Sequence, residues 1–442
     1  DDSPETGIRR TFPLFTIRNA IGLTFAPPPQ PPPKSESAPV CCLGENSLPP
    51  APKPKLTVDK NMTITLDLNK AKSPDITVPD PKAKPLGAWV SYRYYPASNG
   101  QNGNGVLVPS FSDIRLAHLG PALDNLTQTW SGQWSAGGKA EYDIVAAALV
   151  KKIQGAYVRH YKAGDFATLK VDMGASVPGK TGAVTLTSSV PDGLGYRSGF
   201  ADAVPQRLPS TRTYHVSAVD GAEWRPDFYQ YSRKKDSDGH PVPEAQYPVA
   251  DFLALKAGHT YRQRFNTAVF GPRVTASAQN FGNGLYREGD QIYGMLWLFS
   301  DGAGHMGDSD LTSATTTLYR DGTKVGSNTD PLTGDKKFKV PAGDAAYRLT
   351  TSVKRSAKVS AAATRIDASW TFRSKKPSDT FAHALPASSV RFQAATGLDS
   401  TVPAGRTVTF PVTVEGAAKG RNLRSLAVWV SYDHGRTWKK VT

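Results

Sequence analysis

The stretch TTTLYRDGTKVG, residues 315–326, carries the clearest fold signal in the chain. Two runs that alternate apolar and polar side chains meet at Asp321-Gly322. A two-residue loop between antiparallel strands requires positive φ at both central residues, and Asp-Gly adopts that geometry at low cost. The stretch therefore predicts a β-hairpin with a type I′ turn.

The same period of two appears on both sides of this hairpin. Val, Ile, Thr, Tyr, Phe and Trp, which favour pleated strands, alternate or cluster in further short runs. We therefore predict an all-β chain, with strands in LTVDKNMTITLDL (56–68), GAWVSYRYY (87–95), ATLKVDM (167–173), AVTLTSSV (183–190) and TRTYHVSAV (211–219).

One phrase, Ala-Gly followed by an alternating run, recurs four times. A glycine able to take positive φ, followed by a strand, is a reusable entry into a sheet. The unequal intervals favour tandem β-sandwich domains of the immunoglobulin type over a solenoid. The four copies are KAGDFATLKV (162–171), KAGHTYRQRF (256–265), PAGDAAYRLT (341–350) and PAGRTVTFPV (403–412). Only AEYDIVAAALVKK (140–152) has helical character, and a buried strand fits it equally well.

Composition divides the chain into four segments. Residues 1–54 hold 13 of the 35 prolines, which favours a disordered Pro-rich N-terminal segment without a core. Pro, Ser and Lys interrupt the pattern near 272 and 380. We therefore predict a β-rich domain over 55–272, with room for two subdomains, and a β-sandwich domain over 273–380. Residues 387–442 contain four or five expected strands, which predicts a partial, truncated β-sandwich with an unpaired edge.

The charge of the chain is strongly basic, with 53 Lys and Arg against 38 Asp and Glu, a net charge of +15. Such a field attracts anionic polymers, either nucleic acid or the acidic glycopolymers of a cell envelope. A solubility charge without a dedicated partner explains it equally well. The positive residues are scattered and no nucleic-acid motif accompanies them, so we expect no nucleic-acid partner. No apolar run approaches the length of a membrane span, so we expect none.

Only two cysteines occur, the neighbours Cys41 and Cys42. Adjacent cysteines cannot staple a long loop, so a disulfide framework is not expected. A thiolate zinc site in the β-rich region is excluded because that region contains no cysteine.

The stretch SYDHGRTW (431–438) raises the question of a hydrolase triad. Successive side chains of a strand point to opposite faces, so Asp433 and His434 would diverge. A triad needs the carboxylate on the imidazole and the hydroxyl on its other nitrogen. The stretch instead matches the S-x-D-x-G-x-T-W pattern of the Asp-box, a structural turn of sialidase-type propeller blades. That resemblance implies a hairpin in which the Asp accepts backbone N–H bonds, the Gly takes an unusual φ and the Trp packs beneath, carried here by Ser431, Asp433, Gly435, Thr437 and Trp438.

A wider search finds no other catalytic motif. No two of the eight histidines have zincin spacing, and neither a nucleophile elbow nor a Walker A loop is present. The stretch SDGAGHMGDSD (300–310) gathers Asp301, Asp308 and Asp310, whose oxygens suit calcium. An ordinary acidic, Gly-rich loop between strands explains this stretch as well. We therefore expect no cofactor other than calcium.

The eight tryptophans offer core or ligand-binding roles. Trp297, Trp370 and Trp429 lie in alternating apolar runs and are predicted to be core residues. Trp130 and Trp134 lie in the Ser- and Gly-rich TWSGQWSAGG (129–138), so we expect them to be exposed. Their rings are therefore candidates for stacking on a sugar or a peptide.

Five phrases in this order resemble the carboxy-terminal extension of large secreted bacterial subtilisin-like serine peptidases. The similarity covers nearly all of 55–442. The phrases are LYRDGTKVG (318–326), VPAGDAAYRL (340–349), ATRIDASWTFRS (363–374), LPASSVRF (385–392) and LRSLAVWVSYDHGRTWKKV (423–441). The resemblance implies secretion and an upstream catalytic peptidase domain as partner.

The motifs of the catalytic domain itself, D-[ST]-G, H-G-T and G-T-S-M-[AS], do not occur in this sequence. We therefore expect this chain to be a non-catalytic accessory region. It would position the enzyme on protein substrate or on the envelope, or support folding. The alternative is an independent secreted β-sandwich protein that binds carbohydrate or anionic cell-envelope polymers. A hydrolase with an unfamiliar constellation is the third hypothesis.

Overall fold

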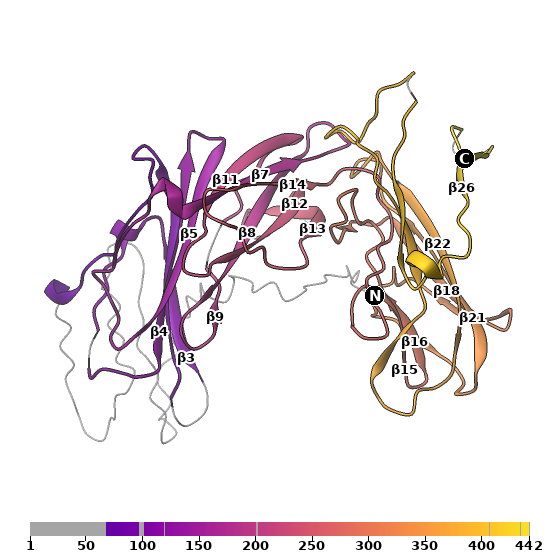
Figure 1. Cartoon of the computed structure of the whole chain (residues 1–442), viewed down its shortest axis with the longest axis horizontal. Helices are drawn as coiled ribbons and strands as arrows, with labels where there is room; N and C mark the ends of the chain where they lie inside the picture. The colour runs from indigo at the N-terminus through magenta and orange to yellow at the C-terminus, as the bar shows by residue number, and fades with distance from the viewer. Residues whose placement is uncertain are drawn as a thin grey trace, which may run out of the picture. The chain divides into compact units, whose positions relative to one another are not determined.

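The computed structural model describes residues 68–96, 101–118, 120–199, 202–405, 407–433 and 435–441. The prediction of an all-β chain is confirmed for these residues (Figure 1). The predicted Pro-rich segment and nearly all of the expected strand at 56–68 lie outside them. The helical elements within the described ranges are 3-10 turns of three residues each: η2 (Leu68–Lys70), η3 (Phe111–Asp113), η4 (Ala163–Asp165) and η5 (Gly420–Asn422). None of these elements has the length or apolar character that a membrane span requires.

The described residues form two compact units. The first contains the described residues up to 134 together with 144–163 and 189–199; the second contains 135–143, 164–188 and the described residues from 202 onward. Both predicted interruptions, near 272 and near 380, therefore lie inside the second unit. The strands β4, β5 and β8, whose bounds follow, contribute residues to both units.

The largest sheet has seven strands. In spatial order they are β14 (Thr260–Phe265), β7 (Phe166–Met173), β11 (Ser210–Ser217), β5 (Ala140–Val150), β4 (Leu126–Ala136), β2 (Lys84–Tyr94) and β3 (Asn102–Val108). The segment predicted as either helix or strand is thus the strand β5. Its Ile144 and Val145 are both fully buried, which shows burial on both faces and explains the unbroken apolar run.

A second sheet has six strands, and a parallel pair stands apart. The six-stranded order is β10 (Gln206–Arg207), β8 (Thr181–Pro191), β12 (Glu223–Lys235), β13 (Pro241–Pro248) and β17 (Asp308–Ser309), with β9 (Tyr196–Arg197) paired to β8. The parallel pair consists of β1 (Asp75–Thr77) and β6 (Val158–His160).

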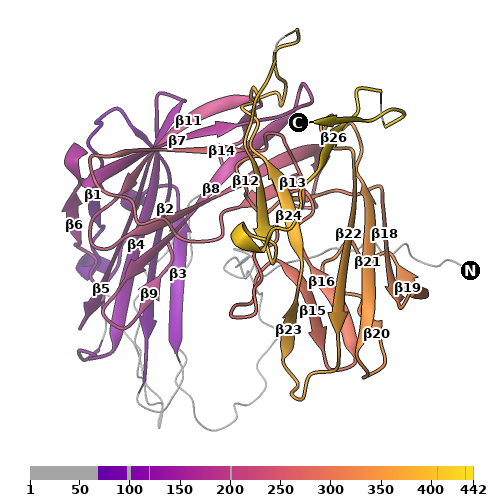
Figure 2. The ribbon, with the colours of Figure 1, turned by 45° about the vertical axis from the view of Figure 1, so that its right-hand side comes forward.

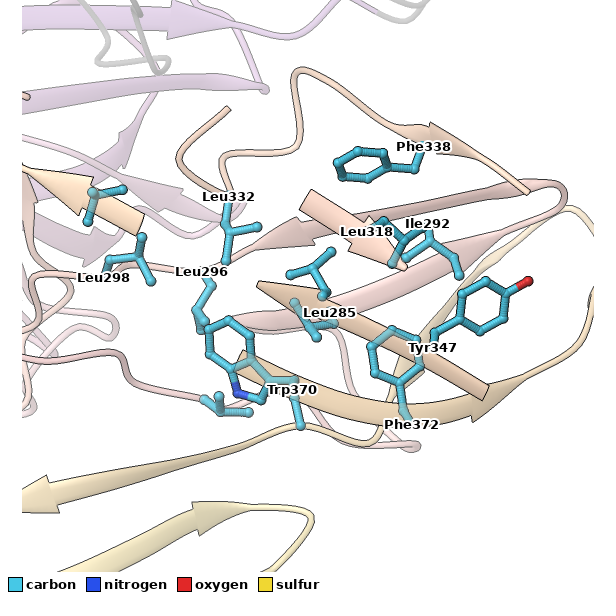
Figure 3. Packing of buried hydrophobic residues seen from close by; sticks show 14 of the residues in the cluster. Leu285, Ile292, Leu296, Leu298, Leu318, Leu332, Phe338, Tyr347, Trp370 and Phe372 are labelled. Carbon is cyan, nitrogen blue, oxygen red and sulfur yellow. The ribbon is translucent and has the colours of Figure 1, made fainter. Parts of the chain in front are cut away.

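Two four-stranded sheets follow in the second unit. One has the order β20 (Phe338–Lys339), β16 (Gln291–Met295), β15 (Gly284–Glu288) and β23 (Ala382–Leu385). The other has the order β19 (Thr323–Asn328), β18 (Ser313–Arg320), β21 (Ala345–Lys354) and β22 (Arg365–Ser374), and Figure 2 shows β18, β21 and β22 side by side. Both sheets contribute to one hydrophobic cluster, which includes Leu285, Ile292, Leu318, Tyr347 and Trp370 (Figure 3). This pair of sheets is a β-sandwich with a shared core.

The local sequence explains the strands of this sandwich. In β21, Tyr347, Leu349 and Val353 are buried, as a period of two requires. The predicted hairpin is confirmed, because Arg320 pairs with Thr323 across a two-residue loop. Asp321 and Gly322 have φ of 50° and 84°, so both residues take the positive φ that the turn demands.

The Ala-Gly phrases lead into strands as predicted at three of their four positions. The copies that begin at 162, 256 and 341 precede β7, β14 and β21 directly. Within the fourth copy (403–412), the described residues 407–411 form no strand. There the next strand begins only at Val412.

Buried polar side chains tie segments of the second unit together. The Gln230 side-chain amide donates to Glu244 Oε1 and to the Val359 carbonyl, each at 2.8 Å. The Asn266 amide donates to the Gly174 carbonyl at 2.9 Å and to Gln230 Oε1 at 2.8 Å. Because buried amides are costly to leave unpaired, these contacts fix which loops meet.

The last strands form two small separate sheets. β24 (Ser388–Phe392) pairs with β25 (Val412–Gly416), and β26 (Val428–Val430) pairs with β27 (Lys439–Val441). Among the described residues from 397 to 441, none is buried. The strands β25, β26 and β27 therefore add no buried side chain, whereas β24 contributes the buried Ser389 and Arg391.

Candidate functional site

The segment 428–441, called the C-terminal hairpin below, contains the stretch that resembles an Asp-box. Its two strands flank a turn built on Asp433. Asp433 Oδ1 accepts the backbone N–H of Thr437 at 2.9 Å, and Oδ2 accepts the Thr437 hydroxyl at 2.6 Å. The Ser431 hydroxyl donates to Asp433 Oδ1 at 2.8 Å and accepts the Gly435 N–H at 2.7 Å. The predicted structural turn is therefore confirmed, while His434 lies outside the described residues.

The remaining turn residues differ from the prediction in one respect. Gly435 has a φ of 84°, as expected. Trp438 donates its indole N–H to the Gly435 carbonyl at 3.1 Å, which holds the ring over the turn. The side chain is nevertheless 63% exposed, so it does not pack beneath the turn into a core.

One face of the C-terminal hairpin is aromatic and cationic. Trp429 lies opposite Lys440 in the register, so their side chains share one face, and Trp438 directly precedes β27 at the turn. Trp429 is 50% exposed, so the prediction that it is a core residue is wrong. A two-stranded sheet without a covering layer leaves this face to solvent, and periodicity alone does not reveal that.

The charge around this face is one-sided. Between 417 and 441 the only acidic residue is Asp433, against six basic residues: Lys419, Arg421, Arg424, Arg436, Lys439 and Lys440. The hydrogen bonds from Thr437 and Ser431 lower the pKa of Asp433 to about 2. The Asp433 carboxylate is thus stabilised by hydrogen bonds within the turn. The surrounding basic side chains are therefore available to bind an anion.

The two tryptophans predicted to be exposed and to stack on a ligand, Trp130 and Trp134, are both buried, so that prediction is wrong. Trp130 is fully buried and stacks on Tyr157 with ring centroids 3.9 Å apart. Trp134 is 7% exposed, and its ring packs closely against Gly132. A Cβ atom at position 132 would lie only 2.6 Å from that ring. β4 lies between β5 and β2 in the sheet, so both rings lie in its interior. The small residues around them permit close packing there.

Of the tryptophans predicted to be core residues, Trp370 is buried. Its indole N–H donates to the Ser388 carbonyl at 2.8 Å, which satisfies the one polar atom of the ring. Trp297 is only half-buried. The core prediction is therefore confirmed for Trp370 alone.

The loop predicted to bind calcium is organised around one buried carboxylate. Asp301 is fully buried, and it accepts the N–H of Asn266 and of His305, each at 2.9 Å. Asp308 lies on the edge strand β17, and the Asp310 N–H donates to the Glu244 carbonyl at 2.8 Å. No close group of three possible metal ligands within the described ranges contains these aspartates. The calcium prediction is therefore untested, and the hydrogen bonds that Asp301 already accepts argue against an ion at that residue.

A different group of possible metal ligands was not predicted from the sequence. At the turn between β12 and β13, ligand atoms of Asp236, Asp238 and His240 all lie within 4.8 Å of one another. The alternating D-x-D-x-H spacing is the sequence signal that could have indicated this group. Asp238 and His240 are exposed, and the Asp236 carboxylate accepts the N–H groups of both, at 2.9 and 3.0 Å, so the cluster also serves to shape the turn.

Four of the described histidines hydrogen-bond to an acid or a hydroxyl, whereas His118 and His259 bond backbone groups. In the described part of the chain, carboxylate partners lie within 3.0 Å of three imidazoles, and a hydroxyl contact is made by a fourth. The acid pairs are Asp75–His160, Asp301–His305 and Asp379–His383, and the hydroxyl contact is Thr168–His215 at 3.4 Å. The acid pairs and the hydroxyl contact thus involve different histidines.

The comparisons with known proteins assign no family. No protein-family model matches the chain, and a search of the curated proteins finds no significant match.

Proposed function

We propose that the chain is a non-catalytic accessory region of a secreted subtilisin-like serine peptidase. The five phrases that resemble the extension of those enzymes support the proposal. They fall in chain order on strands and turns of the second unit, from the β18–β19 hairpin to the β26–β27 hairpin, and leave out β20 and β25. In this role the region holds the enzyme on protein substrate or on the cell envelope, or supports its folding.

One observation carries the accessory role rather than a catalytic one. The serine, aspartate and threonine of the SYDHGRTW stretch are consumed in hydrogen bonds that shape a turn. Polar groups committed to a turn do not shuttle protons for hydrolysis. The exposed aromatic and basic residues of the same hairpin are instead suited to contact with another molecule.

Two experiments test this proposal. The coding sequence upstream of Asp1 is read for in-frame D-[ST]-G, H-G-T and G-T-S-M-[AS] motifs, which we expect to find. The purified chain is also incubated with casein and a fluorophosphonate probe. We expect neither cleavage nor labelling, and labelling of any serine would overturn the non-catalytic role.

A second candidate function is an independent secreted β-sandwich protein that binds carbohydrate or anionic cell-envelope polymers. The exposed rings of Trp429 and Trp438 beside Lys440 favour it, because flat aromatic faces stack on sugars and lysine attracts acidic groups. Calorimetric titration with polygalacturonate, and with its neutral methyl ester, tests this function. Binding of the acidic form alone, together with a signal peptide at the start of the gene, would favour it over the accessory role.

A further inference from the structure

The C-terminal hairpin is a two-stranded sheet, so each of its strands has an open edge within the described chain. β26 pairs only with β27 in the sheet order, and each strand has three residues. The outer backbone N–H and C=O groups of such strands are a template for a further strand. An isolated two-stranded hairpin is at best marginally stable in water, and a third strand or a covering layer stabilises it.

The side chains along β27 favour one kind of occupant. Trp438 is held over the turn by its bond to Gly435, so its ring is already fixed before any ligand arrives. Lys440 lies opposite Trp429 on one face of the hairpin, and Lys439, its neighbour in β27, points to the opposite face. A strand laid along β27 would therefore meet a cation on each of its faces and an aromatic ring on one.

Charge decides against a second copy of this chain as the occupant. Two such hairpins would bring together six basic residues against two aspartates, since each contributes Arg436, Lys439 and Lys440 and one aspartate between 428 and 441. Both aspartates are already committed to their turns. Like charges at this spacing repel, whereas an acidic partner is attracted and steered to the site.

We propose that the outer edge of β27 accepts an acidic polypeptide in extended conformation, which adds as a third strand. Its backbone pairs with β27, and its acidic side chains meet Lys439 and Lys440 on the two faces. An acidic polysaccharide or a single-stranded nucleic acid would use the rings and the cations but not the backbone edge. A polypeptide uses all three features. The inference rests on the proposed contact with protein substrate, for which it names acidic, extended segments.

The experiment uses the full chain and calorimetric titration at low salt. The probe is a decapeptide in which pairs of glutamates alternate with pairs of valines, so that both faces of the extended peptide carry glutamates. We expect saturable binding that weakens as salt is added, and about tenfold weaker binding when neighbouring backbone amides, which face the two opposite edges of the peptide, are N-methylated. The matching lysine–valine peptide should not bind.

Variants separate this edge from the rest of the basic surface. Lys440→Glu should weaken binding of the acidic peptide by about tenfold or more. Lys324→Glu, the same reversal on the exposed strand β19, is the matched control and should leave binding within about twofold. Trp429→Ala should also weaken binding, with Phe381→Ala, a 74% exposed aromatic elsewhere, as its control. The Thr437 amide resonance reports whether each hairpin variant keeps its turn.

Three results would overturn the proposal. They are no binding of the acidic peptide, equal binding of the N-methylated peptide, and stronger Lys440-dependent binding of polygalacturonate or oligothymidylate than of the peptide. None of them bears on the upstream coding sequence or on probe labelling, so this inference can fail while the accessory role stands.

Discussion

Asp301 accepts a hydrogen bond from the backbone N–H of Asn266 at 2.9 Å, although 35 residues separate them. Asn266 has a φ of 57°, and its side-chain amide reaches back to Gly174. The His305 ring bonds the same Asp301 oxygen at 3.0 Å and stacks on Phe265 at 4.2 Å between ring centroids. One buried carboxylate thus ties the end of β14 to the 300–310 loop.

Replacement of this carboxylate should destabilise the protein. Asp301→Ala removes the acceptor of two backbone N–H groups and one imidazole, which remain buried. We expect a loss of about 3 kcal/mol in the free energy of unfolding. Urea unfolding measures it, with Asp344→Ala as the control, since Asp344 makes an exposed ion pair with Arg373 and should matter little. Equal effects of the two substitutions would contradict this account.

Calcium should not stabilise the chain through the 300–310 loop. An ion bound at Asp301 would have to displace the hydrogen bonds that its two oxygens accept. We therefore expect no saturable rise in Tm when calcium is added after treatment with EDTA, because a ligand specific for the folded state raises Tm. A saturable rise that Asp308→Asn abolishes would restore the calcium site predicted from the sequence.

The Asp433 turn should open only in strong acid. Its pKa is about 2 in the folded hairpin, below the ordinary value of 3.8. Folding therefore favours the ionised form, so the stabilisation is complete above the ordinary value and is lost as the pH falls through about 2. The Thr437 amide resonance, followed by NMR against pH, should shift with a midpoint near that value. Asp433→Asn should remove the titration, and a midpoint at the ordinary value would show that the turn bonds do not form.

The buried carboxyl of Asp143 should make stability depend on pH in the opposite sense. Burial raises its pKa well above 3.8, and Glu141 raises it further, while Arg212 lowers it. Neither Asp143 oxygen has a hydrogen-bond partner within the described residues. The folded state therefore retains the proton, and stability falls as pH rises from the ordinary pKa toward the raised one.

Asp143→Asn tests this because the amide keeps the shape of the carboxyl group and has no proton to lose. In urea unfolding at several pH values, the variant should be less sensitive to rising pH than the wild type. Identical pH profiles of the two proteins would show that Asp143 is ionised in the folded state.

Trp130 should behave as a core residue rather than a ligand platform. Trp130→Ala removes a fully buried ring that stacks on Tyr157. We expect a loss of about 4 kcal/mol in the free energy of unfolding, as for other large-to-small core changes. Trp438→Ala, at an exposed ring, should change the global unfolding midpoint little. If Trp130→Ala left stability intact and abolished binding of a sugar or peptide, the original ligand role would be correct.

Local chemistry made much of the fold predictable. Asp321-Gly322 supplied the positive φ of a hairpin, and SYDHGRTW supplied both the acceptor and the glycine of a turn. These features depend on neighbouring residues, so the sequence alone carries them. The tryptophans were harder to place, because exposure depends on what lies above a strand. Trp130 and Trp429 both lie in strands, yet only the first lies inside a large sheet.

The sequence by itself determined that the chain is built of strands, where several of its turns fall, and that its net charge is positive. Only the tertiary structure decided that β5 is a strand, that Asp301 is a buried acceptor, and that Trp429 and Lys440 share one exposed face. The physical reason is the separation along the sequence between the residues that interact. A turn is stabilised by atoms a few residues apart, whereas burial and charge pairing depend on segments that meet only after the sheets have formed.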